Sequence, residues 1–231
     1  KGIPVCNVPT YGTACVGQYA IALLLEVCHH IGHHDKTVHE GKWANHIDWC
    51  YWDHSLIELD GKTAGIIGFG RIGQTTGRIA KALGMKVLAY DVYEIAEDVK
   101  ETYNAEQCSV EVILKAADFI SIHTPLTEET RGMIADEQFD MMKETAVIVN
   151  AARGGIIDEK ALYTALKNRK IYAAASDVFT SEPPASDDWI QELIHMDSFI
   201  LTPHIGSRTV EAESNTVEMA TDTLIKLLEE A

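Results

Sequence analysis

Short apolar runs alternate with stretches of helical periodicity along most of the chain. The apolar runs predict strands over residues 64–69, 86–90, 119–123, 146–150, 171–176 and 199–202. Apolar positions that recur every three or four residues predict helices over residues 13–31, 72–83, 110–116, 159–167 and 209–230. Because strands that alternate with helices build βαβ units, the pattern predicts an α/β fold: a doubly wound, mainly parallel sheet with helices on both faces.

Two segments depart from this alternation. Residues 34–56 are rich in aromatic side chains and have weak periodicity, so we expect an arm that lies against another surface. The apolar run at residues 20–25 is flanked by Gln18 and Glu26, and it is far shorter than the roughly 20 residues that a membrane span needs. This run therefore predicts a buried helix.

Composition adds limits on partners and compartment. The 231 residues are 46% hydrophobic and 23% charged, which is typical of a globular protein and predicts one large domain. The formal charge of -16 argues against broad binding to nucleic acid or anionic membranes, whose phosphates it would repel. The five cysteines are widely spaced and form no CxxC pair, which indicates neither a disulfide framework nor a zinc ribbon. A reducing, cytoplasmic setting is expected.

A glycine-rich turn is the first chemical motif. The string GFGRIG, residues 68–73, follows a predicted strand and opens a predicted helix. In this spacing Gly68 allows a tight turn, Gly70 lets backbone approach a pyrophosphate, and Gly73 lets the helix pack closely on the strand. Asp91 ends the next strand, where it would bind the adenosine ribose and favour NAD over NADP; the alternative is a capping or solvated carboxylate. Together these features predict a Rossmann-type dinucleotide site.

Three polar residues follow later strands at comparable positions: Arg153, Glu182 and His204. An arginine can hold a carboxylate bidentately, a histidine can transfer a proton near neutral pH, and a carboxylate can orient that histidine. This set suits the reduction of a 2-oxo acid. Taken singly, each residue has a structural alternative, as a surface arginine, a loop charge, or a capping or core histidine.

The motifs GFGRIG with Asp91, HTPLTEETRGMI, NAARGGIIDEKAL, DVFTSEPP and TPHIGS, in this order, resemble the D-isomer-specific 2-hydroxyacid dehydrogenase family. The resemblance covers nearly the whole chain. It implies that Arg153 binds the substrate, that His204 is the general acid/base and that Glu182 is its partner. The cofactor-binding residues it implies are Gly68, Gly70, Arg71, Ile72, Gly73, Asp91, Thr124, Pro125, Thr130, Ala151, Ala152, Asp177 and Gly206.

The resemblance also implies an activity and an assembly. Family members transfer hydride between NAD(H) and a small D-2-hydroxy or 2-oxo acid. The strings NVPTYGTACVGQ and HHDKTVHEGKW are most similar to the glycerate dehydrogenase, or hydroxypyruvate reductase, branch, with glyoxylate as another possible substrate. A homodimer through the cofactor domain is implied, because the corresponding first helix and arm of the family meet a second subunit. No nucleic-acid or membrane partner is expected.

Three alternatives are compatible with parts of this pattern. Formate dehydrogenases share the scaffold but pair the histidine with glutamine, whereas this chain has Glu182. The C-terminal-binding-protein corepressors keep a similar triad as NAD-dependent dimeric scaffolds that bind peptides. The chain could also be an NAD-binding fragment that is catalytically incomplete.

Relative to the family, the second, substrate domain is largely absent from this chain. We expect residues 1–7 to be the last strand of a truncated substrate domain, residues 8–207 to be the NAD-binding domain, and residues 208–231 to lead back toward the missing part. The chain begins without Met or a signal-type segment, which indicates a piece of a longer protein. Smaller departures are Ala173, where the family often has glycine, and Ser176, where it often has an apolar residue.

The string CHHIGHH, residues 28–34, places His30 and His34 one helical turn apart, which is metal-ligand spacing. It has no HExxH pattern and no third placed ligand. We therefore predict no native metal, although the cluster could bind nickel or zinc adventitiously.

Overall fold

A seven-stranded, entirely parallel sheet forms the centre of the computed structural model, which describes residues 5–229. The strands lie in the order β3-β2-β1-β4-β5-β6-β7. Their bounds are β1 Thr63–Ile67, β2 Lys86–Tyr90, β3 Ala105–Gln107, β4 Phe119–Ile122, β5 Val147–Asn150, β6 Ala173–Ser176 and β7 Phe199–Leu201. The order reverses between β1 and β4, so the predicted doubly wound α/β fold is confirmed.

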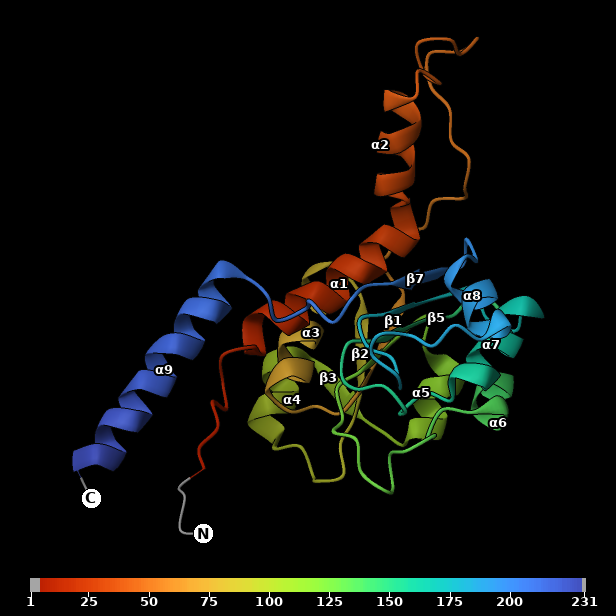
Figure 1. Ribbon diagram of the computed structural model, residues 1–231. Coiled ribbons are helices and arrows are strands. Elements are labelled where there is room, and N and C mark those ends of the chain that lie inside the picture. The colour runs from red at the N-terminus through yellow and green to blue at the C-terminus, as the bar shows by residue number, and fades with distance from the viewer. Residues whose placement is uncertain (1–4, 230–231) are drawn as a thin grey trace.

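The described residues form nine named helices, most of which pack around the sheet, whereas α2 and α9 extend away from it (Figure 1). Their bounds are α1 Thr13–His29, α2 Ile31–His39, α3 Arg71–Ala82, α4 Glu97–Tyr103, α5 Val110–Ala116, α6 Asp136–Met141, α7 Glu159–Lys167, α8 Asp188–Ile194 and α9 Val210–Glu229. Polar side chains begin two of them: Ser109 accepts a hydrogen bond from the Val112 amide at 3.3 Å, and Asp158 accepts one from the Ala161 amide at 2.9 Å.

Alternate residues of each strand point to opposite faces of the sheet, and both faces are buried because helices pack on each of them. On β1, Ala64 joins an apolar cluster with α1 and α3, while Ile67 joins the cluster beneath α5, α6, α7 and α8. Gly65 lies where a Cβ atom would come within 2.3 Å of Ile113 on α5, so a side chain there would displace the helix. This packing fixes the strand ends, from which the loops of the site emerge.

An arm projects from this body (Figure 1). It is formed by α2 and by the irregular residues 40–56, the returning segment, which lead back along α2. The predicted helix over residues 13–31 ends at His29 instead, because His30 adopts a left-handed backbone conformation with φ 47°. The start of the arm predicted for residues 34–56 is helical, as part of α2. Three arm tryptophans, Trp43, Trp49 and Trp52, are 53%, 84% and 68% exposed, so the arm presents an apolar surface.

The predicted strands agree with the observed ones to within two residues at either end. The sequence did not predict β3, a three-residue strand with only Ala105 buried, nor the helices α2, α4, α6 and α8. The strand expected over residues 1–7 begins outside the described residues, and Val5 to Asn7 have irregular structure. The predicted helix over 209–230 is α9, whose described part ends at Glu229.

Over residues 5–229, no single helix is both long and apolar enough to cross a membrane. Only α1 and α2 taken together are long and apolar enough among the described residues, and a bend of 58° separates these two helices. Most of the apolar side chains of α1 are buried against the sheet and α3, including Ile21, Leu24 and Val27.

Candidate active site

A cavity of about 660 Å³ lies at the carboxyl edge of the sheet, where ligands bind in doubly wound folds. Parallel strands bring their carboxyl ends to one edge, so loops that are distant in sequence meet there. Of the predicted site residues, the cavity is lined by Ile72, Thr124, Pro125, Ala151, Ala152, Arg153, Asp177 and His204. Residues not predicted also line it, among them Tyr11, His123 and Ser207.

The glycine-rich turn has the geometry that its spacing predicts. Gly68 has φ 93°, in the left-handed region, and a Cβ there would lie 2.8 Å from the backbone of His123 and Thr124. A Cβ on Gly73 would lie 2.0 Å from the Gly68 carbonyl oxygen. By contrast, Gly70 has no atom within 4 Å of that position, so open space lies over the amino end of α3. Free amides at a helix amino terminus favour an anion such as a phosphate.

Asp91 follows β2 and lies beside this turn. One carboxylate oxygen accepts a hydrogen bond from the Phe69 amide at 2.8 Å, and the other accepts one from the Tyr93 amide at 3.2 Å. The carboxylate is thus held at the rim of the glycine-rich turn. Its contact with a ribose stays a prediction.

The loop after β4 supplies two buried polar atoms that have no hydrogen-bond partner among residues 5–229. These are Nδ1 of His123 and Oγ1 of Thr124. The other ring nitrogen of His123 lies 2.8 Å from the hydroxyl of Ser121, and burial lowers the pKa of His123 to about 4, so the ring is neutral at physiological pH. Thr130 hydrogen-bonds the Pro125 carbonyl at 2.6 Å and is not among the lining residues. A ligand with hydrogen-bonding groups, such as a dinucleotide, fits the two unpaired atoms.

Arg153 stands at the cavity wall directly after the turn that ends β5. Asn150 shapes this turn, because its side chain donates to the Arg153 carbonyl at 2.9 Å and accepts from the Ala152 amide at 3.1 Å. The Arg153 guanidinium donates to the Ala152 carbonyl at 2.6 Å, which leaves other N–H groups available for an anion. Asn150 is a positioning residue that sequence reasoning missed, although it opens the NAARGG motif.

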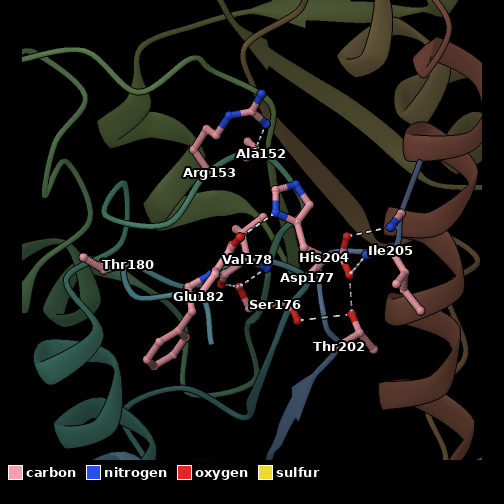
Figure 2. Close-up of polar contacts among 12 residues, drawn as sticks. Ala152, Arg153, Ser176, Asp177, Val178, Thr180, Glu182, Thr202, His204 and Ile205 are labelled. Atoms are coloured by element: carbon pink, nitrogen blue, oxygen red, sulfur yellow. Dashed lines mark hydrogen bonds and ion pairs between the residues drawn. The ribbon is translucent and has the colours of Figure 1, made fainter. Parts of the chain in front are cut away.

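His204 and Glu182 form the ion pair predicted for them. The His204 Nδ1 lies 2.8 Å from the Glu182 carboxylate, which leaves Nε2 free (Figure 2). His204 has φ 54°, a strained conformation for a residue other than glycine, as is frequent at functional sites. Burial alone would raise the pKa of Glu182, but hydrogen bonds from His204 and the Phe179 amide, with the charge of Arg153 nearby, lower it below its usual range. Glu182 is therefore an anion held against the His204 ring.

Asp177 holds the segment that carries His204. It is 2% exposed, and its Oδ1 accepts hydrogen bonds from Thr202 Oγ1 at 2.7 Å and from the Ile205 amide at 2.9 Å. Its Oδ2 accepts one from the Gly206 amide at 2.7 Å (Figure 2). A Cβ on Gly206 would lie 2.9 Å from this oxygen, so the close approach requires glycine. The prediction that Asp177 binds the nicotinamide carboxamide is untested, whereas its bonds to the 202–206 segment are direct.

The described residues contain no group of three or more His, Cys, Asp or Glu side chains that could hold a metal ion. His34 is unsuited to be a ligand, since Nδ1 hydrogen-bonds the His30 carbonyl at 2.8 Å and Nε2 accepts from the Asp53 amide at 3.3 Å. The spacing of His30 and His34 therefore reflects packing at the base of the arm.

Comparison with known proteins agrees with this geometry. The family described as "D-isomer specific 2-hydroxyacid dehydrogenase, NAD binding domain" matches residues 21–206. The chain is 49% identical to a hydroxypyruvate reductase of Blautia hydrogenotrophica over 99% of this chain and 69% of the relative. It is 42% identical to a D-3-phosphoglycerate dehydrogenase of Archaeoglobus fulgidus over 93% of this chain, but spans only 39% of that longer relative.

A solved structure has the same fold. It is D-lactate dehydrogenase of Aquifex aeolicus complexed with NAD and lactic acid, which superposes with a TM-score of 0.85 at 30% identity. The match covers 96% of this chain and 68% of that one.

Proposed function

Because the chain belongs to the D-isomer-specific 2-hydroxyacid dehydrogenase family, whose members are NAD-dependent oxidoreductases, we propose that its cavity is the active site for that chemistry. The reaction interconverts a D-2-hydroxy acid and the corresponding 2-oxo acid. The observation that carries the proposal is the shared cavity, which predicted catalytic residues (Arg153, His204) and predicted cofactor-binding residues (Ile72, Thr124) line together.

Arg153 binds the substrate carboxylate and polarises the adjacent carbonyl, since a guanidinium pairs with planar anions and stabilises charge that develops on oxygen. His204 donates a proton to that oxygen from Nε2 in the reductive direction, because Nδ1 is held by Glu182. Glu182 fixes the ring orientation and stabilises the imidazolium. In the oxidative direction the same nitrogen accepts the proton.

The residues around the glycine-rich turn suit NAD. Gly70 and Arg71, at the amino end of α3, would hold the pyrophosphate, and Asp91 would accept hydrogen bonds from the ribose. Further along the cavity, the unpaired Oγ1 of Thr124 and Nδ1 of His123 would bond to the cofactor. When held by these residues, NADH would supply the hydride for C2 of the substrate. The other predicted contacts, from Pro125, Thr130, Ala151, Ala152, Asp177 and Gly206, belong to the same proposal.

We propose hydroxypyruvate and D-glycerate as the substrate pair, with glyoxylate and glycolate as the second choice. The support is the 49% identity to a hydroxypyruvate reductase that extends over 99% of this chain. Glyoxylate reductases of Korarchaeum cryptofilum and Pyrococcus furiosus are 40% and 42% identical, which supports the second pair. The chain spans 66% of each of these two relatives, so the complete substrate site is part of the proposal.

The test is NADH oxidation with hydroxypyruvate, glyoxylate and pyruvate, alongside NADH binding followed by tryptophan fluorescence. We expect His204→Ala to lower turnover by roughly 10²-fold or more while NADH affinity stays within about twofold. His195→Ala is the matched control, because His195 is exposed at the end of α8 and, among the described residues, its side chain bonds only to the Gln191 carbonyl. Full turnover in His204→Ala would refute the catalytic assignment. NADH binding without turnover in the parent chain would restrict it to a cofactor domain.

We further propose that residues 8–207 act as the NAD-binding unit and that two copies associate through α1 and the arm. The support for association is the exposed apolar surface of Trp43, Ile47, Trp49 and Trp52. A cytoplasmic location is proposed because Cys6, Cys15, Cys28, Cys50 and Cys108 are all free thiols. Sedimentation analysis of the parent and of a Trp49→Ser variant tests the dimer: a monomeric parent would contradict it.

A further inference from the structure

Four histidine rings meet at the base of the arm: His30, His33, His34 and His54, which we term the histidine cluster. The His30 and His54 rings stack with centroids 4.1 Å apart and planes 21° from parallel. The His33 ring lies edge-on to that of His54 at 4.8 Å and to that of His34 at 5.2 Å. Three rings come from the junction of α1 and α2, and His54 comes from the returning segment. The cluster therefore joins the outgoing and returning parts of the arm.

His34 is bonded in a way that requires it to be uncharged. Its Nδ1 lies 2.8 Å from the His30 carbonyl, which can only accept, so this nitrogen carries the proton. Its Nε2 lies 3.3 Å from the Asp53 backbone amide, which can only donate. A second proton on the ring would set two N–H groups against each other. Protonation of His34 thus breaks a link between α2 and the returning segment.

The surroundings leave little room for further positive charge. His33 Nε2 lies 2.8 Å from the Asp53 carboxylate, and hydrogen bonds from Lys42 and then His33 lower the pKa of Asp53 to about 2. The Asp53 carboxylate therefore already contacts the Lys42 ammonium through one oxygen and the His33 ring through the other. Asp53 also supplies the amide that bonds to His34. Because the Asp53 carboxylate already contacts Lys42 and His33, it cannot also compensate a proton on another ring of the cluster.

His30 lies deepest in the cluster. It adopts φ 47° between α1 and α2, and its Nε2 is buried with no hydrogen-bond partner in the described part of the chain. Burial lowers the pKa of His30, and the neighbouring His54, His34 and His33 lower it further, against an opposing effect of Glu26. The Glu26 carboxylate is itself occupied by the Gly32 amide at 3.1 Å. A proton on His30 would therefore lie among three other histidine rings, with the Glu26 carboxylate offsetting only part of the effect of burial and of those rings.

We propose that the histidine cluster is an acid-sensitive latch, which holds the returning segment of the arm against α2 at neutral pH and releases it in mild acid. The released arm can take up protons that the latched arm excludes. The free energy of the released arm relative to the latched arm therefore falls as the pH drops below about 6.5, the ordinary pKa of histidine. Above that pH the latched arm is fully favoured. The proposal depends on arm contacts alone and is independent of the catalytic assignment.

Other titratable groups around the cluster do not supply the missing compensation. They are Glu26 and His29 on α1, Asp35 on α2, and Lys42, Cys50, Tyr51 and Asp53 on the returning segment. Asp35 pairs with His39, away from the four rings, at 3.4 Å. The Tyr51 hydroxyl is bonded to Thr37 at 2.7 Å. Metal binding suits the cluster poorly, since two of its rings stack face to face and His34 has both nitrogens in use.

The arm carries its own optical probe. Three of the four tryptophans, Trp43, Trp49 and Trp52, lie in the arm, and Trp43 donates a hydrogen bond to the Trp49 carbonyl at 2.9 Å. In a Trp189→Phe background only the arm fluoresces on excitation of tryptophan. We expect the emission to change between pH 7.5 and 5, with a midpoint at about pH 5–6.5, while far-UV circular dichroism stays constant.

Variants in that background separate the latch from other effects of acid. In His34→Gln the amide oxygen can still accept from the Asp53 amide but does not titrate, so the midpoint should fall by roughly one pH unit or more, because only the other three rings still titrate. His54→Gln removes one neighbouring charge and should lower the midpoint by roughly half a pH unit. His195→Gln, outside the cluster, should titrate as the parent does. An unchanged parent emission, an unshifted midpoint in His34→Gln or in His54→Gln, or loss of circular dichroism in parallel with fluorescence would each overturn the proposal.

Discussion

Replacing Asp177 by asparagine removes one oxygen of a buried carboxylate while preserving its shape. In the native chain the two oxygens accept three hydrogen bonds, of 2.7 to 2.9 Å, from Thr202, Ile205 and Gly206. If the asparagine oxygen takes the place of Oδ1, its NH₂ group faces the Gly206 amide. That amide is then a donor with no acceptor, in a site where Asp177 is 2% exposed.

The cost follows from these contacts. A hydrogen bond to a charged group contributes about 1.5–3 kcal/mol, and a buried donor left unpaired costs about 1–3 kcal/mol. Relief of the carboxylate's own desolvation offsets part of the loss, so we expect the free energy of unfolding to fall by about 2–4 kcal/mol. For a chain of this size that corresponds to a Tm lower by roughly 5–15 °C. The segment bearing His204 also loses its anchor, and turnover should fall by roughly 10²-fold.

Thermal unfolding and NADH-dependent reduction of hydroxypyruvate measure the two effects. Asp197→Asn is the matched control, because Asp197 is exposed and forms no ion pair or side-chain hydrogen bond among the described residues. A Tm for Asp177→Asn within about 1 °C of this control would refute the energetic reasoning. A normal Tm decrease with full activity would instead show that the anchor does not position His204.

Two further predictions concern other parts of the fold. Gly73→Ala should lower both Tm and NADH affinity, because its Cβ would lie 2.0 Å from the Gly68 carbonyl oxygen. Gly70→Ala should lower only NADH affinity, because its Cβ would lie in open space. Thermal unfolding and NADH titration distinguish the two variants, and equal Tm values would contradict the steric argument. Burial favours a raised pKa for Asp118, but its hydrogen bond to Lys143 at 2.8 Å and a backbone amide bond lower it overall. A carboxylate whose pKa is lower in the folded than in the unfolded state stabilises the fold above the unfolded-state pKa, and this stabilisation is lost as the pH falls through the folded-state pKa. Measured by urea unfolding, Asp118→Asn should therefore lower the free energy of unfolding by about 1–2 kcal/mol at pH 7 but have little effect near pH 2. An equal loss at both pH values would contradict it.

Local rules allowed much of this protein to be predicted from its sequence. A buried strand needs an apolar run whatever it pairs with, so the strands of the sheet other than β3 were recognisable. The spacing of the glycines reflects steric limits on the backbone that arise within six residues. Gly68 and Gly73 both lie where a Cβ atom would clash with nearby backbone, as the spacing predicts. The motifs also identified the family, which the match to residues 21–206 confirms. By contrast, β3 has three residues and one buried side chain, too few to leave a pattern.

Contacts between distant residues were decided only by the tertiary structure. Glu182 and His204 were predicted as partners, but the 2.8 Å contact depends on a left-handed His204 held by Asp177. Asp177 was expected from the family resemblance among the cofactor-binding residues, but only the structure shows that its carboxylate anchors a segment 25 residues and more away. His54 likewise reaches His30 only because the arm folds back. Such contacts arise from packing of elements far apart in the chain, and neither periodicity nor spacing records them.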